Sequence, residues 1–471
     1  MEQKTAKRRR IQRVGIALAA AALVLGMTGA VACASAEPEA SGGNGALSGE
    51  LVFWHSFVQA DRAAAIEEAA ARFEEENPGT NITIEIMPWT DFKKRWRAGA
   101  ANGDLPDIST ACNMYETEEL VAAGLLQPAD AVIEAIGRER FADNVLAELA
   151  HNGDTYGVPY YSHAYVLWYR TDLLAAAGLS VPRTWDELAT AARTLTDPGQ
   201  GIYGCAMALS PDDFTAVINL HMYVRAAGGS LLDDNLQANL TSPEALAGIA
   251  YWAELYRDCS PADAIDDSVT EQAARFYAGQ TAFDFNSGFH VSGVAGTSPE
   301  LLDDISCAPL PAMDADGAAP SSVVTHIPLV LYRQTQNPAL AQAFLEFLYE
   351  DENYGAFLDS APVGMLPSIR GISSTEDYQS NPLRRQFADE ERVIQNAMLT
   401  GNALGFEEGP NLHAGILVSS DAIEVMFRRI LQEKTPVEEA AQEAEDQLNR
   451  QFAEADATLA ANGSANEVNN R

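Results

Sequence analysis

The sequence has 471 residues, 47% of them hydrophobic, and a formal net charge of −37 at pH 7. A chain of this length and composition can bury the cores of two or three domains, which excludes a mainly disordered protein. The large negative charge excludes a nucleic-acid-binding protein, because such proteins present basic surfaces to phosphates.

Residues 1–32 have the pattern of an export signal. Basic residues come first, an apolar segment runs from Val14 to Met27, and small residues precede Cys33. The tetrapeptide AVAC resembles a bacterial lipobox, with Ala30 where Leu is usual, and it predicts lipidation at Cys33. We therefore expect a lipoprotein anchored to the outer face of the cell membrane. The alternative is an uncleaved anchor, because the apolar segment is just long enough to span a bilayer.

A tether and a βαβ unit follow. Residues 33–48 are polar and small, which is typical of a flexible tether. The apolar run ELVFWHSF, a helix that begins near Asp61, and the alternating segment NITIEI predict a strand, a helix and a parallel strand. A helix over 90–101 and the short strand ISTA come next. Residues 113–116 then follow the carboxyl end of a strand, where open α/β sheets bind ligands.

The aromatic segment PYYSHAYVLWY at residues 159–169 is either a buried strand or the wall of a ligand site. We predict a strand over 165–169 and a helix over 171–177 that ends at Gly178. Trp185 is interpreted as a helix-packing residue, and so is Trp252. Further helices are predicted over 182–195, 214–227, 243–257 and 269–278, before a strand in GQTAFDFNSGF.

Cysteine spacing selects neither a disulfide pattern nor a metal site. Beyond Cys33 the sequence contains Cys112, Cys205, Cys259 and Cys307. Four cysteines allow three complete pairings, and nothing in the sequence chooses among them. No cysteine or histidine group has the spacing of zinc ligands, and we find no nucleotide-binding or hydrolase motif. No metal and no cofactor are therefore expected.

Several segments, in order, resemble family one of the extracellular solute-binding proteins, the capture subunits of ATP-driven sugar importers. They are LVFWHSF, FEEENPGTNITIEI, GDLPDI, YVLWYRTDLLAAAGLSVPRTWDELATAARTL, GQTAFDFNSGF, NPALAQAFLEFLYEDENYGAFLD and TPVEEAAQEAEDQL. The resemblance covers almost all of residues 51–452. Arg170 and the pair Phe289-His290 depart from the family pattern.

The resemblance implies an α/β fold of two lobes, each a mostly parallel sheet flanked by helices, joined by a hinge that the chain crosses several times. By analogy, residues 48–158 with 326–372 form the N-terminal lobe, and residues 162–322 with 378–455 form the C-terminal lobe. Residues 456–471 are a polar tail. Under this assignment Cys112 stands alone in its lobe, so we expect it to be unpaired.

The implied function is binding without catalysis. A monomer captures a mono- or oligosaccharide between the lobes and delivers it to the permease subunits of an ABC importer. Three alternatives stay open: glycerol-3-phosphate or a phosphodiester as ligand, a sensory or adhesive lipoprotein, and a secreted glycoside hydrolase with two carboxylates. A phosphate would need basic residues, which are almost absent from the segments that the resemblance places in the site.

A sugar site combines flat aromatic surfaces for C–H faces with amides, carboxylates or histidines for hydroxyls. Tyr160, Tyr161 and Tyr165 are expected near this site. Trp54 and Phe289 could instead be core residues, the histidines of the list below could be structural, and its aspartates could cap a helix. The resemblance implies these ligand contacts: Trp54, His55, Ser56, Asn113, Tyr115, Glu116, His163, Asp212, Asp213, Phe214, Asn286, Ser287, Phe289, Asn411 and His413.

Overall fold

The computed structural model describes residues 47–469, apart from 111–112, 211–212, 316–321 and 408. Residues 1–45 and 46–471 are separate units, and everything below concerns the second. The export signal, the lipidation of Cys33, the state of Cys112 and the role of Asp212 lie outside the described residues and stay predictions. The three cysteines that are described are free and buried.

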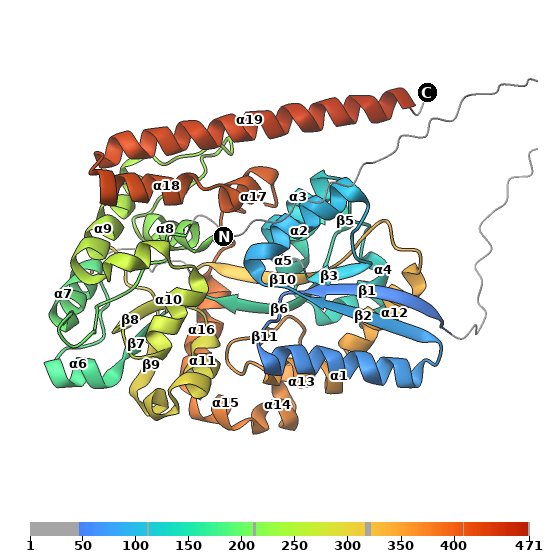
Figure 1. Cartoon of the computed structure of the whole chain (residues 1–471), viewed down its shortest axis with the longest axis horizontal. Coiled ribbons are helices and arrows are strands. Elements are labelled where there is room, and N and C mark those ends of the chain that lie inside the picture. Colours follow the sequence, from blue (N-terminus) through green and yellow to red (C-terminus); the bar gives the residue numbers. More distant parts are fainter. Residues whose placement is uncertain (1–46, 111–112, 211–212, 316–321, 408, 470–471) are drawn as a thin grey trace, which may run out of the picture. The chain divides into compact units, whose positions relative to one another are not determined.

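The first strands of the described chain belong to a sheet of six strands, which later segments complete (Figure 1). Its strands are β1 (Gly49–His55), β2 (Thr80–Ile86), β3 (Ile108–Thr110), β6 (Val158–Ala164), β10 (Val324–Leu331) and β11 (Leu366–Pro367). The helices α1 (Ala60–Glu76) and α2 (Trp89–Asn102) connect the first three. The strand order is β11-β6-β10-β3-β1-β2. β1 pairs in parallel with β2 and β3, which confirms the predicted βαβ unit.

A second sheet has three strands in the order β8-β7-β9. They are β7 (Val166–Arg170), β8 (Phe283–Asn286) and β9 (Ile305–Ala308), and a separate hairpin joins β4 (Ala150–His151) to β5 (Asp154–Thr155). Both pairings of β7 are antiparallel, as are those of β10 with β3 and β6 and of β11 with β6. The expectation of mostly parallel sheets is therefore wrong. Parallel neighbours need a crossover helix, and of the strands described only β1, β2 and β3 are joined by consecutive βαβ crossovers.

Helices account for most of the remaining chain. Between the two sheets they are α3 (Met114–Ala122), α4 (Asp130–Ile136), α5 (Asp143–Ala147), α6 (Thr171–Ala177), α7 (Trp185–Leu195), α8 (Thr215–Ala226), α9 (Pro243–Cys259), α10 (Val269–Tyr277) and α11 (Phe289–Thr297). Later helices are α12 (Pro338–Leu348), α13 (Asp351–Asp359), α14 (Glu376–Ser380), α15 (Pro382–Gln386), α16 (Ala388–Thr400), α17 (Leu412–Ser419), α18 (Ala422–Arg428) and α19 (Val437–Asn469).

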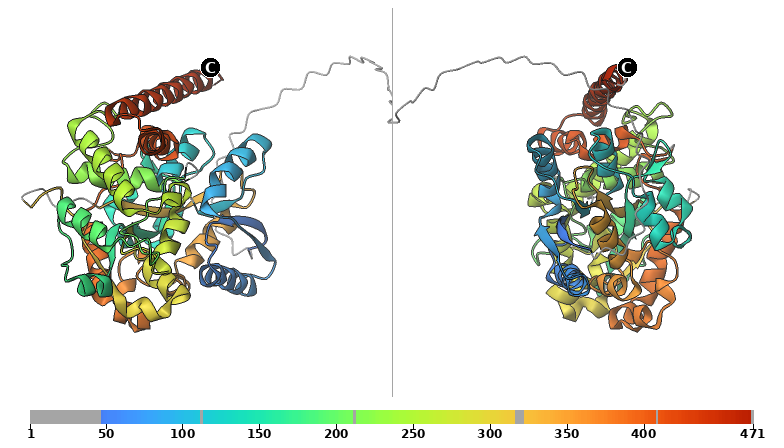
Figure 2. Two further views of the ribbon diagram at one scale, coloured as in Figure 1. Left: turned by 60° about the vertical axis from the view of Figure 1, so that its left-hand side comes forward. Right: turned by 90° about the vertical axis from the view of Figure 1, so that its right-hand side faces the viewer.

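Short 3-10 helices and one π-helical turn complete the fold. They are η1 (Arg138–Arg140), η2 (Ala262–Asp266), η3 (Pro299–Asp304), η4 (Ile372–Ser374) and the π-turn η5 (Arg429–Glu433). The long α19, coloured red in Figure 2, packs against α17 and α18. Within the described ranges, no helix is both long and apolar enough to cross a membrane.

Local sequence signals explain where the predicted helices begin and end. α7 begins after Thr184, whose hydroxyl accepts a hydrogen bond from the Glu187 backbone N–H at 3.3 Å. α6 ends at Gly178, which adopts a left-handed φ of 68° that side chains with a Cβ disfavour. The predicted helices over 171–177 and 182–195 are confirmed, as are those that correspond to α8, α9 and α10.

Each sheet has a hydrophobic core of its own, and a third core contains residues of both sheets. The six-stranded sheet packs against α1, α12 and α13, whereas β7 and β8 join a core built mainly from α7, α8, α9, α17, α18 and α19. The Trp185 ring stacks on Tyr251 at 4.4 Å between centroids, and the Trp252 ring meets Phe427 edge-on at 4.2 Å. Both tryptophans are buried, which confirms their predicted packing role.

Between β6 and β7, the chain passes from one sheet to the other through a single residue. β6 ends at Ala164, β7 begins at Val166, and Tyr165 lies between them. The Tyr165 backbone N–H donates to the Val323 carbonyl at 3.1 Å, just before β10 begins. The side chains at the end of β6 therefore lie where the two sheets adjoin.

The packing of Trp252 generates a stability prediction. Replacing this 1% exposed ring by Trp252→Ala leaves a cavity against Phe427 and should lower the free energy of unfolding by about 3–5 kcal/mol. Urea denaturation measures the change. The control Leu399→Ala, at an 83% exposed side chain, should cost less than about 0.5 kcal/mol. A loss below about 1 kcal/mol for Trp252→Ala would contradict the assigned core.

Candidate functional site

Aromatic side chains line one face at the end of β6. Tyr161 and His163 alternate along the strand, so they lie on the same face, and Tyr165 continues the row. The His163 ring lies 6.1 Å from the Tyr161 ring and 5.9 Å from the Tyr165 ring. Flat rings in this arrangement offer a surface on which an apolar ligand face can stack.

Phe289 meets this row from α11, the helix that follows β8 of the other sheet. It is the first residue of α11, and its ring lies 6.3 Å from Tyr161 and 5.8 Å from His163. Gly364 lies so close to the ring that a Cβ there would be 2.6 Å from Cδ1 of Phe289. This close packing holds Phe289 against the end of β6. Residues of β6 and of α11 thus form one aromatic group.

Arg62 completes the group from α1. Its guanidinium lies 4.6 Å from the centre of the Phe289 ring, in cation–π contact. Only 8% of Arg62 is exposed. Burial lowers the pKa of Arg62, and the phenols of Tyr161 and Tyr277 oppose this shift only in part. Among the described residues, no carboxylate lies within ion-pair distance of this guanidinium.

Two polar atoms beside the aromatic row have no hydrogen-bond partner among the described residues. They are Nδ1 of His163 and Oγ1 of Thr325, and both are buried. Thr325 on β10 is the register partner of His163 on β6, so their side chains share a face of the sheet. An unpaired buried polar atom is costly. This pair therefore marks a place where a ligand hydroxyl would gain hydrogen bonds.

The charge state of His163 follows from its surroundings. Burial, then nearby His326 and Arg62, lowers the pKa of His163 to about 3. The ring is therefore neutral at physiological pH, with one nitrogen as donor and the other as acceptor. We call the six residues around this point the β6 cluster: Arg62, Tyr161, His163, Tyr165, Phe289 and Thr325.

The predicted residues of β1 have some protein contacts, but Nε1 of Trp54 and Nε2 of His55 are buried without a hydrogen-bond partner among the described residues. Trp54 is buried beneath the Arg95 guanidinium, which lies 4.3 Å from its ring. His55 accepts a hydrogen bond at Nδ1 from the Phe57 backbone N–H at 3.2 Å, and its ring stacks on that of Phe57. Burial lowers the pKa of His55 to about 4. The Ser56 hydroxyl is likewise buried. Phe57 connects them to the β6 cluster, because its ring stacks on His55 and lies 6.1 Å from the Tyr161 ring.

Of the residues predicted after β3, Asn113 and Tyr115 also form hydrogen bonds within the protein. Asn113 caps α3, its side chain accepting from the Glu116 backbone N–H at 3.0 Å. The Tyr115 hydroxyl accepts from the Leu404 backbone N–H at 2.7 Å. The carbonyl of Tyr115 lies so close to α17 that a Cβ on Gly415 would be 2.9 Å from it. All three predicted residues are buried, and they join α3 to the segment before α17.

Predicted residues of the later chain act mainly as caps and turns. Asp213 accepts from the Phe214 backbone N–H at 2.7 Å, from the Thr215 hydroxyl at 3.0 Å and from the Val269 backbone N–H. Burial raises the pKa of Asp213. The side-chain oxygen of Asn286 accepts from the Ser287 backbone N–H at 2.9 Å.

Asn411 and His413 have partners remote from the β6 cluster. Asn411 caps α17 by accepting from the Ala414 backbone N–H at 2.8 Å. The two ring nitrogens of His413 are 2.8 Å from the Leu236 carbonyl and 3.1 Å from Asp456. Its ring also stacks on a phenylalanine of α19 at 4.4 Å. Both side chains thus serve the packing around α17.

The structure therefore brings two predicted contacts, His163 and Phe289, into one cluster with Tyr161 and Tyr165, which were expected near the site, whereas Tyr160 packs in the core of the six-stranded sheet. Arg62 and Thr325 were not predicted. Few basic residues were found in the segments that the resemblance places in the site, and Arg62 lies outside those segments. One signal was available, because the buried face of α1 runs through Arg62, Ile66, Ala69, Ala70 and Phe73. A basic residue at a core-facing position of a helix indicates a buried charge.

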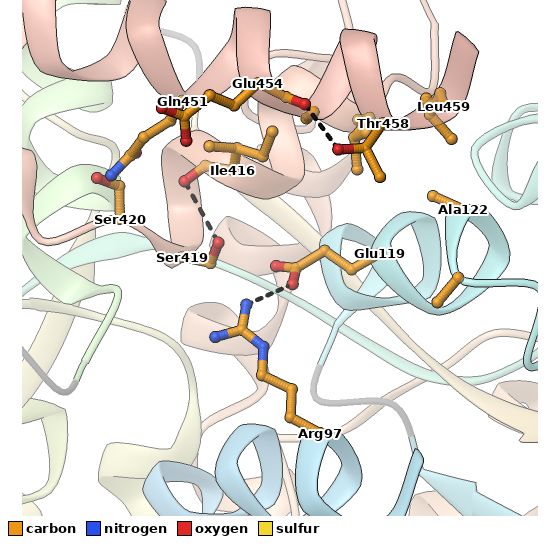
Figure 3. A pocket seen from close by; sticks show the side chains of 13 residues that line it. Arg97, Glu119, Ala122, Ile416, Ser419, Ser420, Gln451, Glu454, Thr458 and Leu459 are labelled. Atoms are coloured by element: carbon orange, nitrogen blue, oxygen red, sulfur yellow. Dashed lines mark hydrogen bonds and ion pairs between the residues drawn. The ribbon is translucent and has the colours of Figure 1, made fainter. Parts of the chain in front are cut away.

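A separate groove of about 670 Å³ opens between α2, α3, α17 and α19 (Figure 3). Arg97 and Glu119 form an ion pair across it at 2.8 Å. Its other lining residues are Ala122, Ala123, Leu412, Ile416, Ser419, Ser420, Gln451, Glu454, Ala455, Thr458 and Leu459. None of the lining residues is aromatic, so the groove offers no stacking surface to a sugar. It also contains none of the predicted contact residues.

The sequence profile described as bacterial extracellular solute-binding protein matches residues 58–355, more than half of the chain. The chain belongs to this family. Its members act outside the cytoplasm. YcjN of Escherichia coli, a putative ABC transporter periplasmic-binding protein, is 23% identical over 340 residues, covering 70% of this chain and 76% of YcjN.

Two further similarities concern named ligands of other proteins. The mannitol-binding protein of Pseudomonas aeruginosa is 25% identical over 49% of this chain and 54% of its own length. A solute-binding protein of Thermotoga lettingae, solved with α-D-tagatose, has a TM-score of 0.75 and 22% identity, covering 86% of this chain and 99% of that protein. The chain therefore has the two-lobed periplasmic-binding-protein fold.

The buried His55 generates a pH prediction. Its pKa is about 4 in the folded protein against about 6.5 when unfolded. The unfolded state therefore binds the proton first, and stability falls as pH drops from about 6.5 to about 4. The free energy of unfolding of His55→Gln should fall by up to about 3 kcal/mol less between pH 7 and pH 4 than that of the unmodified protein. Urea denaturation near the two pH values measures the difference. The control is His151→Gln, at a half-buried histidine whose side chain is 42% exposed. Identical pH slopes for His55→Gln and the unmodified protein would contradict the prediction.

Proposed function

We propose that this protein captures a sugar or sugar alcohol between its two lobes and delivers it to the permease subunits of an ABC importer. The observation that carries the proposal is the β6 cluster, in which α1, β6, β10 and α11 bring aromatic faces and unpaired polar atoms together. Mannitol and tagatose, named for two relatives, are both small polyhydroxylated molecules. The cluster offers what such molecules need, ring surfaces beside hydrogen-bonding groups.

The mechanism is a shift between open and closed forms. Arg62 belongs to α1, which packs on the six-stranded sheet, and Phe289 begins α11, which follows β8 of the other sheet, so a ligand that contacts both residues stabilises the form in which the lobes are close. The permease then recognises the closed form. No step of this cycle breaks a covalent bond, and the β6 cluster contains no pair of carboxylates for glycoside hydrolysis. We also propose that the protein is a monomer held at the membrane by lipidated Cys33.

Thermal denaturation of the purified exported protein tests the proposal. Monosaccharides, disaccharides and sugar alcohols are added singly, with amino acids as the control class. A ligand that binds only the folded state raises Tm by mass action. A rise with a sugar or sugar alcohol, without product formation, is the expected result. A rise with amino acids alone would overturn the proposal, and product formation would show an enzyme.

His163 provides a test of the site itself. Its Nδ1 has no described protein partner, so His163→Ala should weaken binding of the ligand found above by about tenfold or more while changing Tm little. The control is His413→Ala, because both nitrogens of His413 are bonded within the protein. That variant should lower Tm without changing affinity. If His163→Ala lowered Tm as much as His413→Ala and left affinity intact, His163 would be structural.

A further inference from the structure

Arg62 is an exception among the buried arginines that the structure describes. Arg170 donates two hydrogen bonds to the Asp172 carboxylate, at 2.7 and 2.6 Å. Arg384 lies 3.2 Å from Glu391 and 3.3 Å from Asp359. Arg62 is buried to the same degree, yet no described carboxylate neutralises it. A buried charge without a partner is strongly unfavourable, so proteins rarely keep one that nothing uses.

The contacts that Arg62 does make cannot replace an anion. The face of its guanidinium stacks on Phe289 at 4.6 Å, and Tyr161 and Tyr277 are its other close neighbours. A stacked ring attracts the cation but accepts none of its five N–H donors in the guanidinium plane. The edge of the guanidinium is the part that binds a carboxylate through two parallel hydrogen bonds.

Two helix N-termini add positive potential at this point, which the exposed Asp61 in the first turn of α1 offsets in part. Arg62 lies in the first turn of α1, and Phe289 is the first residue of α11. Neither helix has a side-chain cap at its N-terminus. The amino ends of helices favour negative charge. The stacking of Arg62 on Phe289 therefore brings a cation and two helix N-termini to one place.

We propose that the ligand of this protein carries a carboxylate, as a uronic or aldonic acid does, and that Arg62 binds this group. The proposal rests on the function proposed above and narrows its ligand class. The sugar ring then lies against the aromatic row, with its hydroxyls toward His163 and Thr325. One arginine balances the single charge of a carboxylate. A phosphate, which carries up to two charges, would need a second cation, and the β6 cluster contains none.

Calorimetric titration of the exported protein with matched pairs tests this inference. The pairs are galactose with galacturonate, glucose with glucuronate, and glucose with gluconate; glucose-6-phosphate and glycerol-3-phosphate are the phosphate arms. We expect at least one acid to bind about 30-fold or more tightly than its neutral parent, because the acid neutralises a buried charge. Raising the salt concentration should weaken that preference only slightly, because the pair is buried.

Arg62→Gln should abolish the preference, with affinity for the acid falling by about 30-fold or more, to that of the neutral sugar. Arg62→Lys retains the charge without the planar fork, so it should retain part of the preference and guards against misfolding of the first variant. The control is Arg95→Gln. Arg95 also stacks on an aromatic ring, but Asp104 and Glu85 neutralise it at 2.9 and 3.5 Å. That variant should keep the preference.

The remaining outcomes separate this inference from the proposed function. Neutral sugars that bind as tightly as their acids would overturn the role of Arg62 and leave sugar capture intact. A stronger response to either phosphate than to any carboxylate would overturn the ligand class. An unchanged preference in Arg62→Gln would show that another group binds the acid. No binding by any sugar, acid or phosphate would overturn both proposals.

Discussion

The direct run of β6 into β7 is the constraint on which the rest of the structure depends. Because only Tyr165 separates the two strands, one extended segment belongs to both sheets. Side chains near this junction must serve two cores at once. The alternation of the strand sends Ser162 to one face, where its hydroxyl lies 2.6 Å from His326, and His163 to the other. On the first face the Ser162 hydroxyl has protein partners, although the Tyr160 hydroxyl has none among the described residues, and the second face meets α1 and α11.

On the second face, close packing buries a cation that no neighbouring side chain neutralises. Phe289 is held by close packing against the loop around Gly364, and Arg62 is held by the buried face of α1. Neither element can withdraw without opening its own core. The result is a charge buried by its neighbours but not neutralised by them. A ligand that supplies the missing anion and hydroxyls would relieve both deficits, which gives it a reason to prefer the form in which the sheets adjoin.

The sequence predicted local structure well because local structure depends on neighbouring residues. Thr184 and Gly178 mark the ends of helices through their own hydroxyl and their own φ, so no distant contact is needed to place them. Strand direction in the sheets was predicted wrongly beyond β3, because it depends on where a strand returns after many residues. The β6 cluster could be predicted only in part, because Arg62 and Phe289 are joined only through tertiary contacts.

Side-chain type was also a weak guide to the site. Asn113, Asp213 and Asn411 follow strands or precede helices, and the same amides and carboxylates that bind sugars also cap helices. Hydrogen-bond partners separate the two roles where residue type cannot. His413 and His163 are both buried histidines near aromatic rings, but both nitrogens of His413 are bonded, and Nδ1 of His163 is not. Other buried atoms, including both ring nitrogens of His221, are unpaired as well, so an unpaired atom points to a ligand only where aromatic surfaces lie beside it, as they do at His163.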